Sequence, residues 1–110
     1  MTEPALAARC AELKEPIREL VQSGLRAQAR AEYFPEVTER LGVVQGILAN
    51  GVTGIDDTGY LAWHREAEPM LRRAASLIAE DKGAEAWALL KNPEVGLYPV
   101  SLACKDCEGW

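Results

Sequence analysis

The chain has 110 residues, of which 48% are hydrophobic, which is enough for one hydrophobic core and too little for two. Its 12 basic and 17 acidic residues give a formal charge of −5, and the longest basic block is a dipeptide, so we do not expect nucleic-acid binding. No apolar run approaches the roughly 20 residues that span a bilayer, and the N-terminus lacks a signal-peptide pattern. These features predict a cytoplasmic protein that does not bind membranes.

The first segment is predicted to be a long helix with Thr2 as its N-cap. Pro16 does not shift the phase of the apolar residues, which predicts a kink inside a continuing helix. Gly24 is expected to interrupt this first helix. The apolar residues recur every three or four positions, which places them on one helical stripe: they are Leu6, Cys10, Leu13, Ile17 and Leu20.

A second helix is predicted to start near Pro35, because the residue before a proline avoids helical geometry. Gly42 and Gly46 lie inside this helix and predict a close approach to a neighbouring helix. A glycine-containing loop between residues 50 and 59 ends it. Its apolar stripe comprises Phe34, Val37, Leu41, Val44 and Leu48.

Two further helices are predicted before the chain changes character. The third begins near Asp57 or Thr58, ends near Glu80, and contains Pro69 as a second kink. The fourth is short and spans about residues 84–91. The inward-facing residues of this pair are Tyr60, Trp63, Ala67, Met70, Ala74 and Leu77 in the third helix and Trp87 and Leu90 in the fourth.

The fold class predicted by these patterns is all-α. Residues 1–92 form a bundle of three long helices and one short helix, and residues 93–110 form an irregular C-terminal tail that packs on it within the same domain. Prolines and glycines break the tail, so Tyr98 to Leu102 are predicted as a short extended segment.

The tail carries a CxxC motif, Cys104 and Cys107, whose spacing allows two thiolates to bind one metal ion. A structural zinc site needs two further ligands, and Cys10 and His64 are the only other cysteine and histidine in the chain. The sequence therefore predicts a zinc site made of these four residues.

Other interpretations of these residues remain open. Cys10 fits the apolar stripe as a buried core residue, and His64 fits a partly buried histidine with a local hydrogen bond. The CxxC pair could also form a disulfide, take part in redox chemistry, or have no special role. Three cysteines cannot all pair within one chain, so free thiols or thiolate ligands in a reducing compartment are the default.

The segment from Ala103 to Cys107 also resembles the haem-attachment segment of the bundle-type c-type cytochromes. That resemblance implies a covalently held haem as cofactor. It covers five or six residues and the helix count, and it departs from the family pattern at Glu108, where an axial histidine would follow the second cysteine.

Trp110 is the last residue and either folds back on the bundle or anchors a partner. With no catalytic constellation recognised, we expect a small, acidic, non-catalytic interaction or regulatory protein. Its partner would be a protein, with a second copy of the chain as one option, and zinc could pin its tail. The alternative is a redox or cofactor-binding bundle that uses the CxxC motif, such as a degenerate c-type cytochrome.

Overall fold

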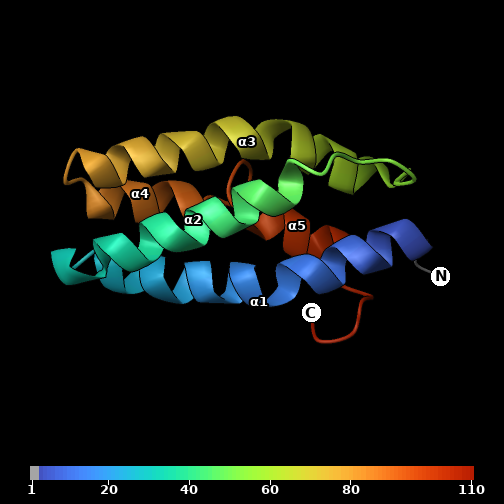
Figure 1. The fold of residues 1–110 in the computed structure, drawn as a ribbon, viewed down its shortest axis with the longest axis horizontal. Coiled ribbons are helices and arrows are strands. Elements are labelled where there is room, and N and C mark those ends of the chain that lie inside the picture. The colour runs from blue at the N-terminus through green and yellow to red at the C-terminus, as the bar shows by residue number, and fades with distance from the viewer. Residues whose placement is uncertain (1–2) are drawn as a thin grey trace.

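The structure is a computed structural model that describes residues 3–110, and its elements are all helical (Figure 1). Thr2, the predicted N-cap of the first helix, lies outside the described residues. No strand occurs in residues 3–110, so the all-α prediction is confirmed. In chain order the elements are α1 (Pro4–Ala27), the 3₁₀ turn η1 (Ala31–Tyr33), α2 (Phe34–Leu48), α3 (Thr58–Ala79), α4 (Gly83–Leu90) and α5 (Tyr98–Ala103).

The first four α-helices run up and down along the long axis of the molecule, as the colour sequence in Figure 1 shows. Each packs on the next in sequence, and α4 also packs on α1, which closes the bundle. The short α5 packs on α3. The particle measures 41 × 24 × 22 Å. In the described part of the chain, no helix is both long enough and apolar enough to cross a membrane.

The predicted apolar stripes form the core of this bundle. Burial of a stripe that repeats at 3.6 residues is what stabilises such helices in water. Pro16 and Pro69 lie within continuous helices, as their undisturbed phase predicted. From the three long stripes every predicted residue except the partly exposed Phe34 is buried: Leu6, Cys10, Leu13, Ile17, Leu20, Val37, Leu41, Val44, Leu48, Tyr60, Trp63, Ala67, Met70, Ala74 and Leu77.

The prediction that Gly24 interrupts the first helix is wrong. Gly24 is buried within α1, and the helix continues to Ala27. A Cβ atom at this position would lie 3.0 Å from Cε3 of Trp87 and 3.2 Å from Cδ1 of Leu90. The glycine therefore makes room for α4, and this packing outweighs the low helix propensity of glycine.

The prediction that Gly42 and Gly46 mark a close helix contact is also wrong. Both are exposed on α2, and a Cβ atom at either position would meet no atom within 4 Å, the helix's own backbone aside. A close approach does occur at Gly83, the first residue of α4. A Cβ there would collide with the carbonyl oxygen of Ala27 and lie 2.8 Å from Cε1 of Phe34.

These glycines give a matched pair of substitutions. Gly46→Ala is expected to raise the free energy of unfolding by about 0.5–1 kcal/mol, because alanine restricts the unfolded chain and favours the helix. Gly83→Ala is expected to lower it by about 1–3 kcal/mol through overpacking. Urea unfolding followed by circular dichroism measures both. Equal effects of the same sign would contradict the close packing of α1, α2 and α4 around Gly83.

The tail packs on the bundle as predicted, but the extended segment predicted for Tyr98 to Leu102 is instead the helix α5. Pro99 lies in the first turn of α5, where proline is tolerated because its missing N–H would have no helical partner. Val100 and the following Cys104 are fully buried, so a helix allows the segment to bury one face. The indole N–H of Trp63 donates to the Gly96 carbonyl oxygen at 2.9 Å and fixes the start of the tail on α3.

Candidate functional site: the cysteine-linked tail and the Arg9 network

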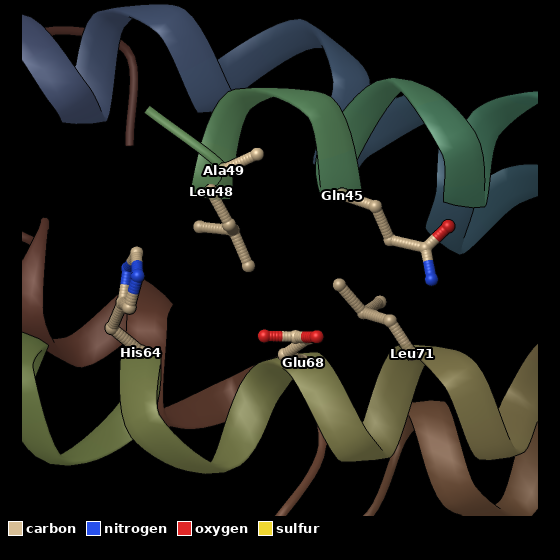
Figure 2. A pocket seen from close by; sticks show the side chains of 6 residues that line it. All are labelled: Gln45, Leu48, Ala49, His64, Glu68 and Leu71. Atoms are coloured by element: carbon tan, nitrogen blue, oxygen red, sulfur yellow. The ribbon is translucent and has the colours of Figure 1, made fainter. Parts of the chain in front are cut away.

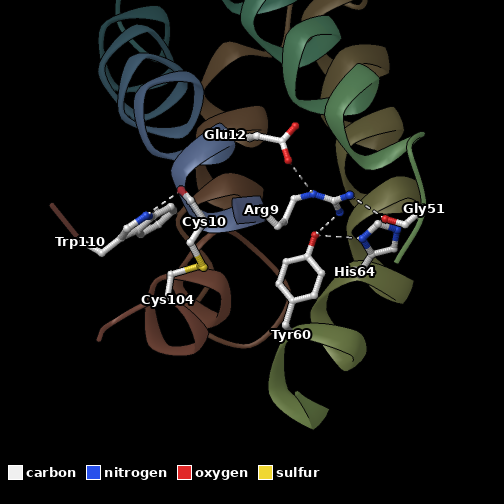
Figure 3. A network of polar contacts seen from close by, with 8 residues as sticks. All are labelled: Arg9, Cys10, Glu12, Gly51, Tyr60, His64, Cys104 and Trp110. Atoms are coloured by element: carbon white, nitrogen blue, oxygen red, sulfur yellow. Dashed lines mark hydrogen bonds and ion pairs between the residues drawn. A yellow bond between two sulfur atoms is a disulfide. The ribbon is translucent and has the colours of Figure 1, made fainter. Parts of the chain in front are cut away.

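Cys10 in α1 and Cys104 at the end of α5 form a disulfide (Figure 3). Their Cα atoms lie 5.7 Å apart, and both side chains are 0% exposed. The bond joins residues 94 positions apart. The default of free thiols or thiolates is therefore wrong for these two residues, and in this structure Cys104 is not bonded to Cys107. Cys10 is also the buried core residue that its place on the stripe suggested.

Cys107 is the third cysteine, and it carries a free, partly exposed thiol. It follows Cys104 by one turn, since its backbone N–H donates to the Cys104 carbonyl oxygen at 2.8 Å. Residues three positions apart in such a turn lie on the same side of it. The free thiol therefore lies one hydrogen-bonded turn after Cys104, which forms one half of the buried disulfide.

The four residues predicted to bind zinc are not assembled into a metal site. Cys10 and Cys104 share a covalent bond, so neither has the thiolate that zinc requires. Within residues 3–110, no group of three or more His, Cys, Asp or Glu side chains is arranged to hold a metal ion. His64 lies in a separate polar network (Figure 3). The disulfide-bonded protein does not fit a zinc centre, and zinc binding by the reduced protein stays a prediction.

The resemblance to a haem-attachment segment meets the same chemical difficulty. Covalent haem attachment uses both sulfurs of a CxxC motif, and the sulfur of Cys104 is bonded to Cys10. Its side chain is also fully buried against the bundle. The residues in this state do not fit a covalently attached haem, and the cofactor-binding alternative stays a prediction.

Trp110 folds back on α1. Its indole N–H donates to the backbone carbonyl oxygen of Cys10 at 2.8 Å, which such an oxygen can accept in addition to its helical bond because it has two lone pairs (Figure 3). Arg18 of the same helix donates to the Gly109 carbonyl oxygen at 3.4 Å. The end of the tail is therefore held by hydrogen bonds next to the disulfide. A partner-binding role of Trp110 stays a prediction.

Arg9 precedes Cys10 in α1 and points to the start of α3 instead of the tail (Figure 3). Its side chain is buried, with only 7% of the residue exposed. Nη1 donates to the Tyr60 hydroxyl at 2.7 Å, and Nη2 donates to the Gly51 carbonyl oxygen at 2.7 Å. Gly51 has φ of 85°, a left-handed conformation that glycine adopts without strain just after α2. Arg9 thus ties α1 to the α2–α3 loop and to α3.

The charge of Arg9 is only partly compensated. Oε1 of the half-exposed Glu12 lies 3.7 Å from Nε, which makes an ion pair but not a hydrogen bond, and this buried Nε has no hydrogen-bond partner. The guanidinium carbon is 5.9 Å from the centre of the Tyr60 ring. A cation held mainly by neutral acceptors raises the electrostatic cost of any further positive charge nearby.

The network continues from Tyr60 to His64, where the Tyr60 hydroxyl and Nδ1 of His64 are 3.1 Å apart. Because the Tyr60 oxygen accepts from Arg9, its hydrogen is free to donate to Nδ1 of a neutral imidazole. Burial lowers the pKa of His64, the Arg9 charge lowers it further, and Glu68 opposes this change. Burial also raises the pKa of Tyr60, against the effect of Arg9. Both groups are therefore neutral near pH 7.

This network predicts a pH dependence of stability. The pKa of His64 is lowered in the folded protein, so the unfolded chain binds more protons between the folded pKa and the unperturbed value of about 6.5. The contribution of neutral His64 to the free energy of unfolding is fully present above about pH 6.5, and it is lost as the pH falls through the pKa of His64 in the folded protein. Urea unfolding across this range should show a weaker pH dependence for His64→Gln than for wild type. Identical pH profiles would contradict the assignment.

A pocket of about 180 Å³ lies where α2 faces α3 (Figure 2). Two of its polar side chains are engaged within the protein, since His64 is hydrogen-bonded to Tyr60 and Glu68 is bonded to Arg72. Its floor is aliphatic. We assign no ligand to it. The lining residues are Gln45 and Leu48 of α2, Ala49 just after it, and His64, Glu68 and Leu71 of α3.

Arg9 was missed in the sequence, although a signal for it exists. It lies three residues after Leu6 and four before Leu13, which places its charge next to an apolar stripe where a buried partner is required. The pairing of Cys10 with Cys104 has no such local signal, because a disulfide depends on the positions of two distant helices.

The comparisons with known proteins place no further constraint on this site: no protein-family model, no curated protein and no solved structure matches the chain.

Proposed function

We propose that the protein is a small, acidic, non-catalytic interaction protein that binds its partner through the outer face of α5. The observation that carries this proposal is the exposure of two large apolar side chains on that helix. Tyr98 is 52% exposed and Leu102 is 50% exposed, while Val100 between them is buried. They are four residues apart and so lie on the same face of the helix.

The surroundings of this face indicate the chemistry of the partner. A surface hollow of about 400 Å³ lies beside Leu102, and Asp57 and Asp106 are among the residues that line it. Lys105 is also part of this lining. An apolar patch with acidic groups at its rim, on a chain of net charge −5, favours a protein surface with apolar and basic side chains.

The disulfide supports this function because it fixes α5. The helix is only six residues long, and a helix of that length does not persist in water without tertiary contacts. Its attachment to α1 through Cys104 keeps Tyr98 and Leu102 in one arrangement before binding, which reduces the entropy lost on association. In this proposal the tail is pinned by a disulfide, where the sequence had predicted zinc.

The cellular location belongs to the same proposal. Disulfides persist mainly in oxidising compartments. The Cys10–Cys104 bond therefore favours such a compartment over the cytoplasm predicted from the sequence, and the location stays a prediction.

The test compares Leu102→Asp with Leu25→Asp, a substitution at a position of similar exposure, 49%, on α1. Both tagged proteins and wild type are used to capture partners from cells of the native host, after circular dichroism has shown equal folding. We expect wild type and Leu25→Asp to retain the same protein and Leu102→Asp to lose it. Capture that is unaffected by Leu102→Asp would contradict the proposed face.

Sedimentation of the purified proteins tests whether the partner is a second copy of the same chain. If the partner is the same chain, wild type sediments as a dimer and Leu102→Asp as a monomer. A dimer in both proteins would place the self-association elsewhere and overturn the α5 face as its site.

A further inference from the structure

We propose that Cys107 is an internal exchange thiol that opens the buried Cys10–Cys104 disulfide and forms a Cys104–Cys107 disulfide in its place. The covalent tie between α1 and α5 then becomes a local bond within the CxxC motif. This proposal concerns the chemistry of the tail and does not depend on the partner proposed above.

The first support is access. Both sulfurs of the Cys10–Cys104 bond belong to side chains that are 0% exposed, so a thiol from solution cannot reach either of them in the folded protein. Thiol–disulfide exchange requires direct attack of a thiolate on a disulfide sulfur. Reduction of this disulfide in the native state therefore requires either a nucleophile that is already inside the fold or an unfolding of the tail.

The second support is position. Cys107 is free, and it follows Cys104 by one hydrogen-bonded turn that places the two side chains on the same side. Its partly buried side chain also packs against the hydrophobic core to which Cys10 and Cys104 belong. The spacing of a CxxC motif allows its two sulfurs to bond, as it does in dithiol oxidoreductases.

The third support is a path to solution. Cys107 lines a surface hollow of about 370 Å³ between the tail and α1, with Ala7, Ala11 and Lys14 on the α1 side. A small thiol can enter such a space. After exchange, the disulfide sulfur of Cys107 faces this hollow. A solution thiol can then attack the Cys104–Cys107 disulfide there, whereas it could not reach the buried Cys10–Cys104 bond.

The exchange step is balanced without an external oxidant or reductant. The Cys107 thiolate attacks the Cys104 sulfur, the Cys104–Cys107 bond forms, and the Cys10–Cys104 bond breaks. Cys10 leaves as a thiolate and takes a proton from water, which replaces the proton that Cys107 gave up. The number of disulfides and free thiols is unchanged.

The consequence for the fold is the release of α5 from α1. In the exchanged form, hydrogen bonds and packing alone hold the tail, including the bond from Trp110 to the Cys10 carbonyl oxygen. External thiols do not change the ratio of these two one-disulfide forms, but they reduce the exchanged form through its accessible Cys107 sulfur, so a thiol-rich environment converts the protein through this form to the fully reduced one.

The test measures reduction of the oxidised protein by glutathione at about pH 8, where thiolates form readily. Samples are quenched by alkylation, and the bonded cysteines are identified by peptide mass mapping. We expect Cys107→Ser to be reduced at least about tenfold more slowly than wild type, because an internal thiol acts at a local concentration that solution thiols do not reach. Wild type should also show a transient species with the Cys104–Cys107 bond and alkylated Cys10.

Two further measurements separate exchange from unfolding. Oxidised Cys107→Ser and wild type should unfold at the same urea concentration, so a slower reduction cannot be explained by greater stability. The variant Cys10→Ser retains Cys104 and Cys107, and it should close to a disulfide in a glutathione redox buffer. Equal reduction rates of wild type and Cys107→Ser, or a Cys10→Ser variant that stays a dithiol, would overturn the proposal.

Discussion

Removal of the Cys10–Cys104 disulfide is expected to lower the free energy of unfolding by about 4 kcal/mol and the melting temperature by roughly 15 °C. The reason is the long loop that the bond closes. It joins residues 94 positions apart, so it restricts nearly the whole unfolded chain and reduces the entropy gained on unfolding. The variant Cys10→Ala with Cys104→Ala measures this effect without leaving an unpaired thiol at either position.

Cys107→Ser is the matched control, since it replaces the partly exposed cysteine that is outside the disulfide. We expect its melting temperature to stay within about 2 °C of wild type, because the Cys107 side chain is only partly buried and serine differs from it by one atom. Calorimetry under non-reducing conditions measures all three proteins. Three alkylatable thiols in the native wild-type protein, or equal melting of wild type and the double variant, would contradict the disulfide.

Tyr60→Phe is expected to lower the free energy of unfolding by about 3 kcal/mol, because it leaves Nη1 of a buried guanidinium without its acceptor. Arg9→Met should have a similar effect by leaving the Gly51 carbonyl oxygen and the Tyr60 hydroxyl without their shared donor. The double variant should lose less than the sum, because Nη1 of Arg9 and the Tyr60 hydroxyl are then removed together and only the Gly51 carbonyl oxygen still lacks its donor.

Arg18→Met provides the control on the same helix. Arg18 is exposed and pairs with Glu15 at 3.0 Å, and surface pairs of this kind contribute about 0–1 kcal/mol. Urea unfolding of wild type, the three single variants and the double variant measures these free energies and completes the double-mutant cycle. Strict additivity of Arg9→Met and Tyr60→Phe would show that the two side chains do not act through each other.

The disulfide and the Arg9 network start from neighbouring residues of α1 and fix different parts of the fold. Cys10 holds the C-terminal tail, and Arg9 holds the α2–α3 loop and the start of α3. Reducing the disulfide therefore releases α5 while the bundle keeps its polar tie. In the exchange that we propose, this separation lets the tail respond to thiols without unfolding of the four-helix body.

The sequence by itself determined the all-α class and the four main helices and, apart from the only partly buried Phe34 and Trp87, the residues that they bury. These properties are local: an apolar stripe at three- and four-residue spacing specifies both a helix and its buried side, and Pro16 and Pro69 left that phase unchanged. The start of the third helix was also predicted near Asp57 or Thr58, and the structure shows that the Asp57 side chain caps it by accepting from the Tyr60 N–H.

Only the tertiary structure decided the cysteine pairing, the burial of Arg9, the helical form of α5 and the roles of the glycines. Each of these features depends on which distant segment of the chain packs against the residue concerned. Gly24 admits Trp87 of α4, while the similar Gly46 meets nothing. Cys104 bonds to Cys10 and not to Cys107, because the folded bundle brings α1 against the end of α5. Spacing along the chain cannot encode such contacts, since they are set by the packing of whole helices around a shared core.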